Sequence, residues 1–130
     1  MTRRTVMASV GGAALLASIA AIIVRGTTDP MIREQEQAAE LYQVRCALCH
    51  ELEGGIGAPL DPRVLAAYGT AQLLFNYVRL AMPYDAPRTL SDEQYWLTVG
   101  HLLRSRGLVA EDRVVNGQTA EGISLGAETR

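Results

Sequence analysis

The chain has 130 residues, 12 arginines, no lysine, 14 acidic residues and a formal net charge of −2 at pH 7. This length allows one small domain with an appendage. No basic patch or stripe is visible, and the residues from Gly26 onward carry a net charge of −5, which argues against binding to nucleic acid.

Residues 1–25 are predicted to form a membrane segment. Val6 to Val24 are 19 residues without a charge, between a pair of N-terminal arginines and Arg25. A helix of this length spans about 28 Å, close to the hydrocarbon thickness of a bilayer. The positive charges before this segment favour an N-terminus on the inner side of the membrane, with the rest of the chain on the outer side. A cleaved signal peptide is the alternative, but the apolar run continues past the small-x-small site Ser18-Ile19-Ala20, so we favour an uncleaved anchor.

Residues 26–33 are predicted to be a polar linker that contains Asp29-Pro30. A helix is predicted from Glu34 to Arg45, because Ala38, Leu41 and Tyr42 recur at helical spacing. This helix runs directly into the most informative motif of the chain.

The motif is Cys46-Ala47-Leu48-Cys49-His50, the C-x-x-C-H signature of covalent attachment of c-type haem. Two thiols on one helical turn can each form a thioether to a haem vinyl group, and the histidine that follows can bind the iron. A dithiol redox pair would not need this histidine. A structural zinc site would need further soft ligands, and the chain has only 2 cysteines. We therefore predict one covalent haem c.

The remainder of the chain alternates loops and helices. Residues 51–62 are predicted to be a loop, because three glycines and Pro59 exclude regular structure. A short helix is predicted over 63–68. Thr70 is a predicted N-cap for a helix over 71–80. Ser91 and Gln94 form a predicted capping box for a last helix to about Arg106. Residues 109–130 show no periodicity and are predicted to be an extended tail.

Residues 34–108 resemble a class I c-type cytochrome, through the helix that leads into C-x-x-C-H, the Gly/Pro loop, the middle helix, Met82-Pro83 and the amphipathic last helix. The resemblance implies an all-α domain of three to four helices around the haem, preceded here by one transmembrane helix. The stretches 81–84 and 90–95 also resemble small mono-haem subunits of periplasmic dehydrogenases.

The resemblance also implies a set of ligands. His50 is the expected proximal ligand of the iron and Met82 the distal ligand, through its sulfur. The backbone carbonyl of Pro59 is the expected acceptor for the outer ring nitrogen of His50. Met31 and His101 are the alternatives for the sixth position. Two axial ligands leave no site for a substrate, so we expect an electron-transfer protein and no enzyme.

Other residues have weaker expected roles. Gly100 is predicted to allow close approach of the last helix to the first, where Tyr42 supplies the aromatic contact. Tyr77 and Arg79 are candidates to bind a haem propionate, although core packing and solvation are the simpler interpretations. The same holds for Tyr84 and Arg88.

The predicted function is one-electron transfer on the outer, periplasmic side of the cytoplasmic membrane. The protein would act as a carrier or as the cytochrome subunit of a membrane oxidoreductase, with a periplasmic dehydrogenase, an oxidase or another electron-transfer complex as redox partner. No small-molecule substrate is expected. The alternatives are a soluble periplasmic cytochrome released after signal cleavage, and a haem sensor or enzyme with a labile sixth ligand.

Overall fold

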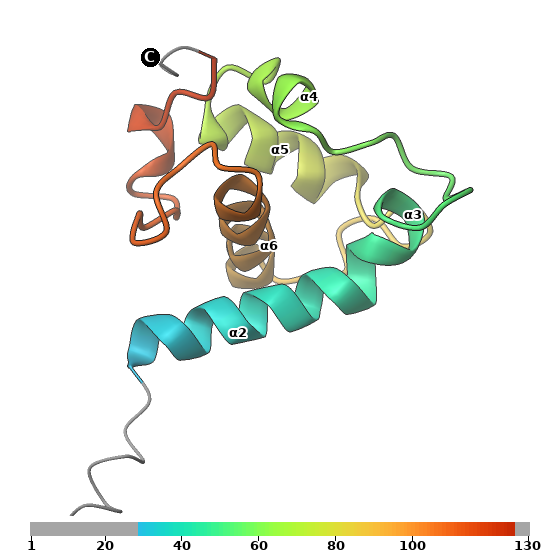
Figure 1. Ribbon diagram of the computed structural model, residues 1–130, viewed down its shortest axis with the longest axis horizontal. Helices are drawn as coiled ribbons and strands as arrows, with labels where there is room; N and C mark the ends of the chain where they lie inside the picture. The colour runs from blue at the N-terminus through green and yellow to red at the C-terminus, as the bar shows by residue number, and fades with distance from the viewer. Residues whose placement is uncertain (1–28, 127–130) are drawn as a thin grey trace, which may run out of the picture. The chain divides into compact units, whose positions relative to one another are not determined.

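The computed structural model describes residues 29–126, and from Arg33 onward these residues form one compact unit. Apart from an isolated bridge between Thr70 and Ser124, this part of the chain contains no strand, so the predicted all-α class is confirmed for it. The helices, shown in Figure 1, are α2 (Pro30–Tyr42), the π-helical η1 (Gln43–Ala47), α3 (Leu48–His50), α4 (Pro62–Ala66), α5 (Ala71–Ala81), α6 (Asp92–Ser105) and the 3-10 turn η2 (Ala120–Gly122).

The predicted membrane segment, residues 1–25, lies outside the described residues. From residue 29 to residue 126, no helix is both long enough and apolar enough to cross a membrane. The end of the predicted linker is helical, since α2 begins at Pro30 and not at Glu34. A carboxylate oxygen of Asp29 accepts a hydrogen bond of 2.9 Å from the Met31 N–H, and Pro30 takes the first helical position, where its missing N–H costs nothing. The Asp-Pro pair therefore starts a helix.

The first helix does not stop before the motif. After Tyr42 its hydrogen bonding changes to the π pattern over Gln43–Ala47, and α3 then continues it through His50. A π turn accommodates one extra residue per turn and frequently marks a functional site. Cys46 lies inside this turn and Cys49 inside α3, so both cysteines are held by helical backbone.

The core lies where α5 packs against α6. Phe75 stacks on Trp96 with ring centroids 3.8 Å apart, and its edge meets Tyr95. Both predicted helix starts are confirmed. The Thr70 side chain accepts from the backbone N–H of residue 73, and Ser91 and Gln94 form the complete capping box of α6. Among the described residues, the largest side chains that are fully buried are Tyr95, Leu65, Leu74, Val99 and Leu103.

Residues 109–126 are part of this core and not an extended tail. The side chains of Val115, Ile123 and Leu125 are buried. The Ala71 N–H donates to the carbonyl of Ile123 at 3.0 Å, and the N–H of Leu125 donates to the carbonyl of Gly69 at 2.8 Å. The prediction missed this packing because the few apolar residues of the segment show no sustained helical or strand periodicity.

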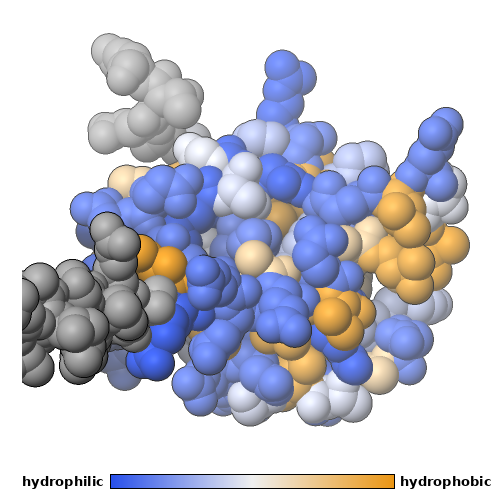
Figure 2. Space-filling view, turned by 60° about the horizontal axis from the view of Figure 1, so that its bottom comes forward, coloured by the Kyte–Doolittle hydropathy of each residue, from blue (hydrophilic) through white to orange (hydrophobic). Residues whose placement is uncertain are grey.

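Helix α5 carries apolar side chains on two faces. Leu74 and Phe75 are buried in the core, whereas Leu73, Tyr77 and Leu80 are 54%, 44% and 57% exposed. Figure 2 shows apolar side chains reaching the surface as separate patches on an otherwise hydrophilic face. A helix in a soluble domain usually buries its apolar stripe. The second stripe, at i, i+4 and i+7, is therefore available to an apolar cofactor or partner.

Candidate functional site

The two thiols of the motif lie one helical turn apart, both are partly exposed, and they are not joined by a disulfide. Burial raises the pKa of the Cys46 thiol to about 11, so this sulfur is protonated at neutral pH. A redox-active dithiol needs the opposite, a lowered pKa that supplies a thiolate. Within residues 29–126, no cluster of three His, Cys, Asp or Glu side chains could hold a metal ion. The Cys46 thiol therefore lacks the lowered pKa of a reactive redox cysteine, and the described residues offer no further ligands for a structural zinc site.

The imidazole of His50 is fixed by one hydrogen bond. Its Nδ1 lies 2.7 Å from the backbone carbonyl oxygen of Ala58. Because a carbonyl can only accept, Nδ1 carries the proton and Nε2 keeps its lone pair for a metal. The expected acceptor was the carbonyl of Pro59, and this prediction is wrong by one residue. Proline restricts the residue before it to extended backbone, and here it is the carbonyl of that residue, Ala58, that meets the ring.

Gly57 allows the loop to lie directly against this imidazole. A Cβ on Gly57 would lie 2.6 Å from Nδ1 of His50 and 2.8 Å from the carbonyl oxygen of Cys49. The Gly57 N–H donates to that same carbonyl at 2.9 Å. The sequence identified a glycine-rich loop but not this role. The position of Gly57 immediately before Ala58-Pro59 was the signal that could have indicated it.

A polar network lies next to the motif. The buried Tyr42 hydroxyl donates to a Glu51 carboxylate oxygen at 2.5 Å, and the Arg106 guanidinium pairs with the same oxygen. Arg106 Nε also donates to the carbonyl of Leu60 at 2.8 Å. The hydrogen bond from Tyr42, followed by the charge of Arg106, holds the pKa of Glu51 below its usual range. Burial and Glu51 together raise the pKa of Tyr42. No local pattern predicts this network, because Arg106 lies 55 positions from Glu51 and 46 from Leu60 in the chain.

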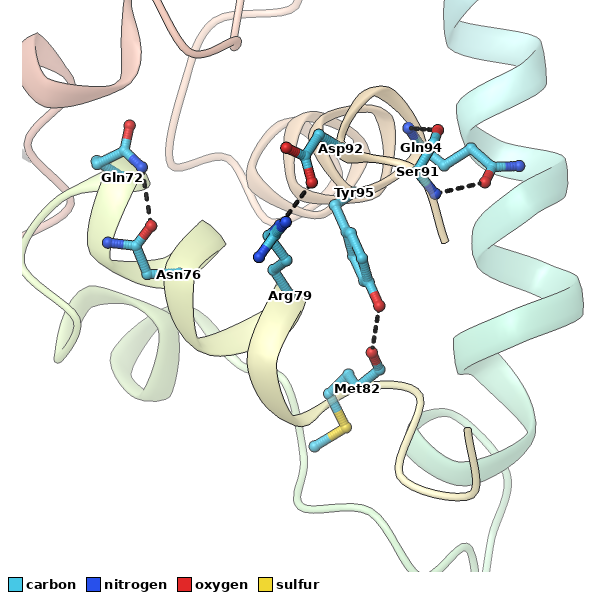
Figure 3. Close-up of polar contacts among 8 residues, drawn as sticks. All are labelled: Gln72, Asn76, Arg79, Met82, Ser91, Asp92, Gln94 and Tyr95. Atoms are coloured by element: carbon cyan, nitrogen blue, oxygen red, sulfur yellow. Dashed lines mark hydrogen bonds and ion pairs between the residues drawn. The ribbon is translucent and has the colours of Figure 1, made fainter. Parts of the chain in front are cut away.

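Met82 lies where α5 ends, with extended backbone, and is half-buried. The fully buried Tyr95 donates its hydroxyl proton to the Met82 carbonyl at 2.8 Å. Figure 3 shows the Met82 thioether pointing away from Tyr95. Arg79, a candidate for a propionate, instead pairs with Asp92 at 2.5 Å on the surface. Tyr77, another candidate, packs its ring against Tyr68 at 5.2 Å between centroids.

The two alternative ligands are placed differently from Met82. The ring of His101 packs against Tyr42, with centroids 5.1 Å apart. Burial, reinforced by nearby arginines, lowers the pKa of His101. Met31 is 43% exposed in the first turn of α2.

The expected role of Gly100 is not supported. The nearest atoms to a Cβ at Gly100 would be those of the Arg104 guanidinium, at 3.1 Å and beyond, and not an atom of α2. Gly100 therefore makes room for a side chain on its own helix. Arg104 uses that position to donate to the carbonyl of Arg113 at 3.1 Å.

These residues fit a covalent haem. Two free thiols on one turn, an imidazole with a bare Nε2 and a thioether are a suitable donor set, and the exposed stripe on α5 is an apolar surface. The fit depends on Gly57, because any side chain there would displace the imidazole.

Residues 33–102, more than half of the chain, match the protein family described as cytochrome C oxidase, cbb3-type, subunit III. No curated protein and no solved structure matches the chain. The matched range contains the motif, Met82 and most of α6. Arg106 and the buried C-terminal segment lie beyond it.

Proposed function

The chain belongs to the family of subunit III of cbb3-type cytochrome c oxidase, and from that premise we propose that it carries single electrons to or from a membrane oxidoreductase, with its haem domain on the outer side of the cytoplasmic membrane. The family gives the coarser function: a class I c-type cytochrome with covalent haem c, which transfers electrons. When bound, haem c supplies an iron that alternates between the ferric and ferrous states.

The protein's own residues hold and orient that group. Cys46 and Cys49 supply the two thioether sulfurs. His50 supplies Nε2 as proximal ligand, because its Nδ1–H is committed to the Ala58 carbonyl. Met82 supplies its sulfur as distal ligand. The observation that carries the proposal is the fixed imidazole of His50 directly after two free thiols. An iron bound on both sides offers no position to a substrate, so the protein transfers electrons without catalysing a reaction alone.

The proposed location and partner rest on the sequence and on the family. Val6–Val24 is an uncharged run long enough to span a bilayer, with arginines on either side. The family description names an oxidase, which favours an oxidase complex as partner over the dehydrogenases suggested by the resemblance. The absence of lysine means that docking uses arginine or apolar contacts.

Purification of the full chain in mild detergent tests this function. We expect haem to appear in the membrane fraction, to co-migrate with an oxidoreductase and to titrate reversibly with one electron. N-terminal sequencing should return residues 1–25. A soluble haem protein that starts after residue 20 would contradict the anchor. Binding of carbon monoxide by the ferrous protein at neutral pH would contradict two-sided ligation and support a haem sensor.

A further inference from the structure

Arg106 binds both ends of the loop that follows the motif. Its guanidinium pairs with Glu51, and its Nε donates to the carbonyl of Leu60 at 2.8 Å. The side chains of Arg106 and Glu51 are 25% and 36% exposed, so water screens their charges only in part. One residue at the end of α6 therefore closes the loop from residue 51 to residue 60.

This loop holds the imidazole of His50. Ala58 accepts the ring N–H, and Gly57 lies directly against the ring. Both residues lie between the two points that Arg106 contacts. A loosened loop would therefore release the hydrogen bond that fixes the ring orientation.

The same contacts place opposite charges beside the iron ligand. Glu51 follows His50 directly in the chain, and its carboxylate also accepts a hydrogen bond from the buried Tyr42. Arg106 neutralises this carboxylate. Removal of one partner would leave a single unpaired charge beside the residue that would bind the iron, and nearby charge and solvent access are among the factors that set a haem reduction potential.

We propose that Arg106 and Glu51 are positioning residues for His50, and that their paired charges set the midpoint potential of the haem. This proposal rests on the proposed binding of iron by His50. Of the two residues, Glu51 lies inside the range that matches the family and Arg106 lies beyond it.

Midpoint potentials of single and double variants test the charge effect in the full-length holoprotein. Arg106→Gln leaves an unpaired carboxylate, which stabilises ferric iron and lowers the potential. Glu51→Gln leaves an unpaired guanidinium and raises it. The double variant lacks both charges, so its potential should lie between those of the two single variants. A merely structural role would shift the potential in the same direction in all three variants, because each opens the loop to water, and that result would overturn the proposal.

Hydrogen exchange of the His50 Nδ1–H, followed by NMR, tests the positioning effect. Arg106→Gln should accelerate this exchange by about tenfold, the scale expected when a hydrogen bond to a charged group is lost. Arg106→Lys keeps the charge but cannot reach both Glu51 and Leu60. Its potential should lie closer to the wild-type value than that of Arg106→Gln, and it should still accelerate the exchange. Unchanged exchange in both variants would contradict the positioning role.

Arg104→Gln is the matched control. It removes the same charge from the last turn of α6, but the native Arg104 side chain contacts the carbonyl of Arg113 and not the loop. It should change the potential less than Arg106→Gln and leave the exchange unchanged. Equal effects from the two variants would overturn the proposal. A wild-type spectrum without histidine-ligated, low-spin haem would instead contradict the proposed ligation itself.

Discussion

Two regions of this molecule differ in whether the chain alone buries their apolar side chains. Around α5, α6 and the C-terminal segment, apolar side chains are paired: Phe75 stacks on Trp96, and Ile123 and Leu125 close the core. In contrast, the two thiols of the motif are free, and the second apolar stripe of α5 is exposed. We refer to these as the closed region and the open region.

The difference separates what stabilises the fold from what the cofactor completes. Burial in the closed region is made by the chain alone. The polar contacts of the open region are already formed, since His50 and Glu51 have hydrogen-bond partners. Its apolar side chains remain exposed and would be buried by the cofactor. Substitutions in the closed region should therefore change the melting temperature, and those in the open region should change the haem spectrum.

The largest effect is expected from deletion of residues 108–130. It removes the buried Val115, Ile123 and Leu125, each worth about 1.5–3 kcal/mol, out of a typical total stability of about 5–15 kcal/mol. We expect the holoprotein to lose cooperative thermal unfolding, measured by circular dichroism. Deletion of residues 127–130, which leaves Val115, Ile123 and Leu125 in place, is the control. An unchanged melting temperature after the long deletion would mean that the segment is a tail after all.

Gly57→Ala tests the open region and should have the next largest effect. The added Cβ meets the imidazole of His50 and the backbone of Cys49, neither of which can move freely. We expect a loss of about 1–3 kcal/mol together with an altered haem spectrum. Gly100→Ala is the matched control, because its Cβ meets only the flexible end of Arg104 and alanine is favoured by about 1 kcal/mol inside a helix. If both variants behaved alike, the contrast between the regions would fail.

Tyr95→Phe tests the contact between the regions. Tyr95 is buried in the closed region, but its hydroxyl holds the carbonyl of Met82. Loss of this hydrogen bond should cost about 1 kcal/mol. It should also weaken the red absorption band of ferric, Met-ligated haem before the protein unfolds. Tyr84→Phe, at a side chain that is 76% exposed, should leave that band intact.

The smallest effect is expected from pH. Burial lowers the pKa of His101 below its ordinary value of 6.5, so below that pH the unfolded chain binds a proton that the folded chain does not. Stability should therefore be complete above about pH 6.5 and should fall as the pH falls through the range below it. His101→Gln should flatten this slope in denaturant titrations at several pH values. A slope that persisted in the variant would assign it to another group.

Local features were predictable from the sequence, and contacts between distant segments were not. Thr70, Ser91 and Gln94 cap their helices through neighbours three residues away, and the motif carries its chemistry in five consecutive residues. The pairing of Glu51 with Arg106 spans 55 positions, and no local pattern encodes it. The burial of Ile123 likewise depends on where α5 begins.

The errors at His50 and Gly100 were also tertiary in origin, whereas the error at Asp29-Pro30 was local. The acceptor for His50 is Ala58 and not Pro59, because the outcome depends on how the loop lies against the ring. Gly100 was interpreted as a contact between helices, yet its free space is used by Arg104. Asp29-Pro30 was interpreted as linker, although the same residues are a standard helix start.

The ferric absorption spectrum of Met82→Ala tests the central claim most directly, which is that His50 and Met82 bind the iron from its two sides. Met31→Ala, at an exposed methionine in the first turn of α2, is the matched control. We predict that Met82→Ala abolishes the red band of Met-ligated haem and lowers the midpoint potential, while Met31→Ala changes neither. An unchanged spectrum and potential in Met82→Ala would contradict the account.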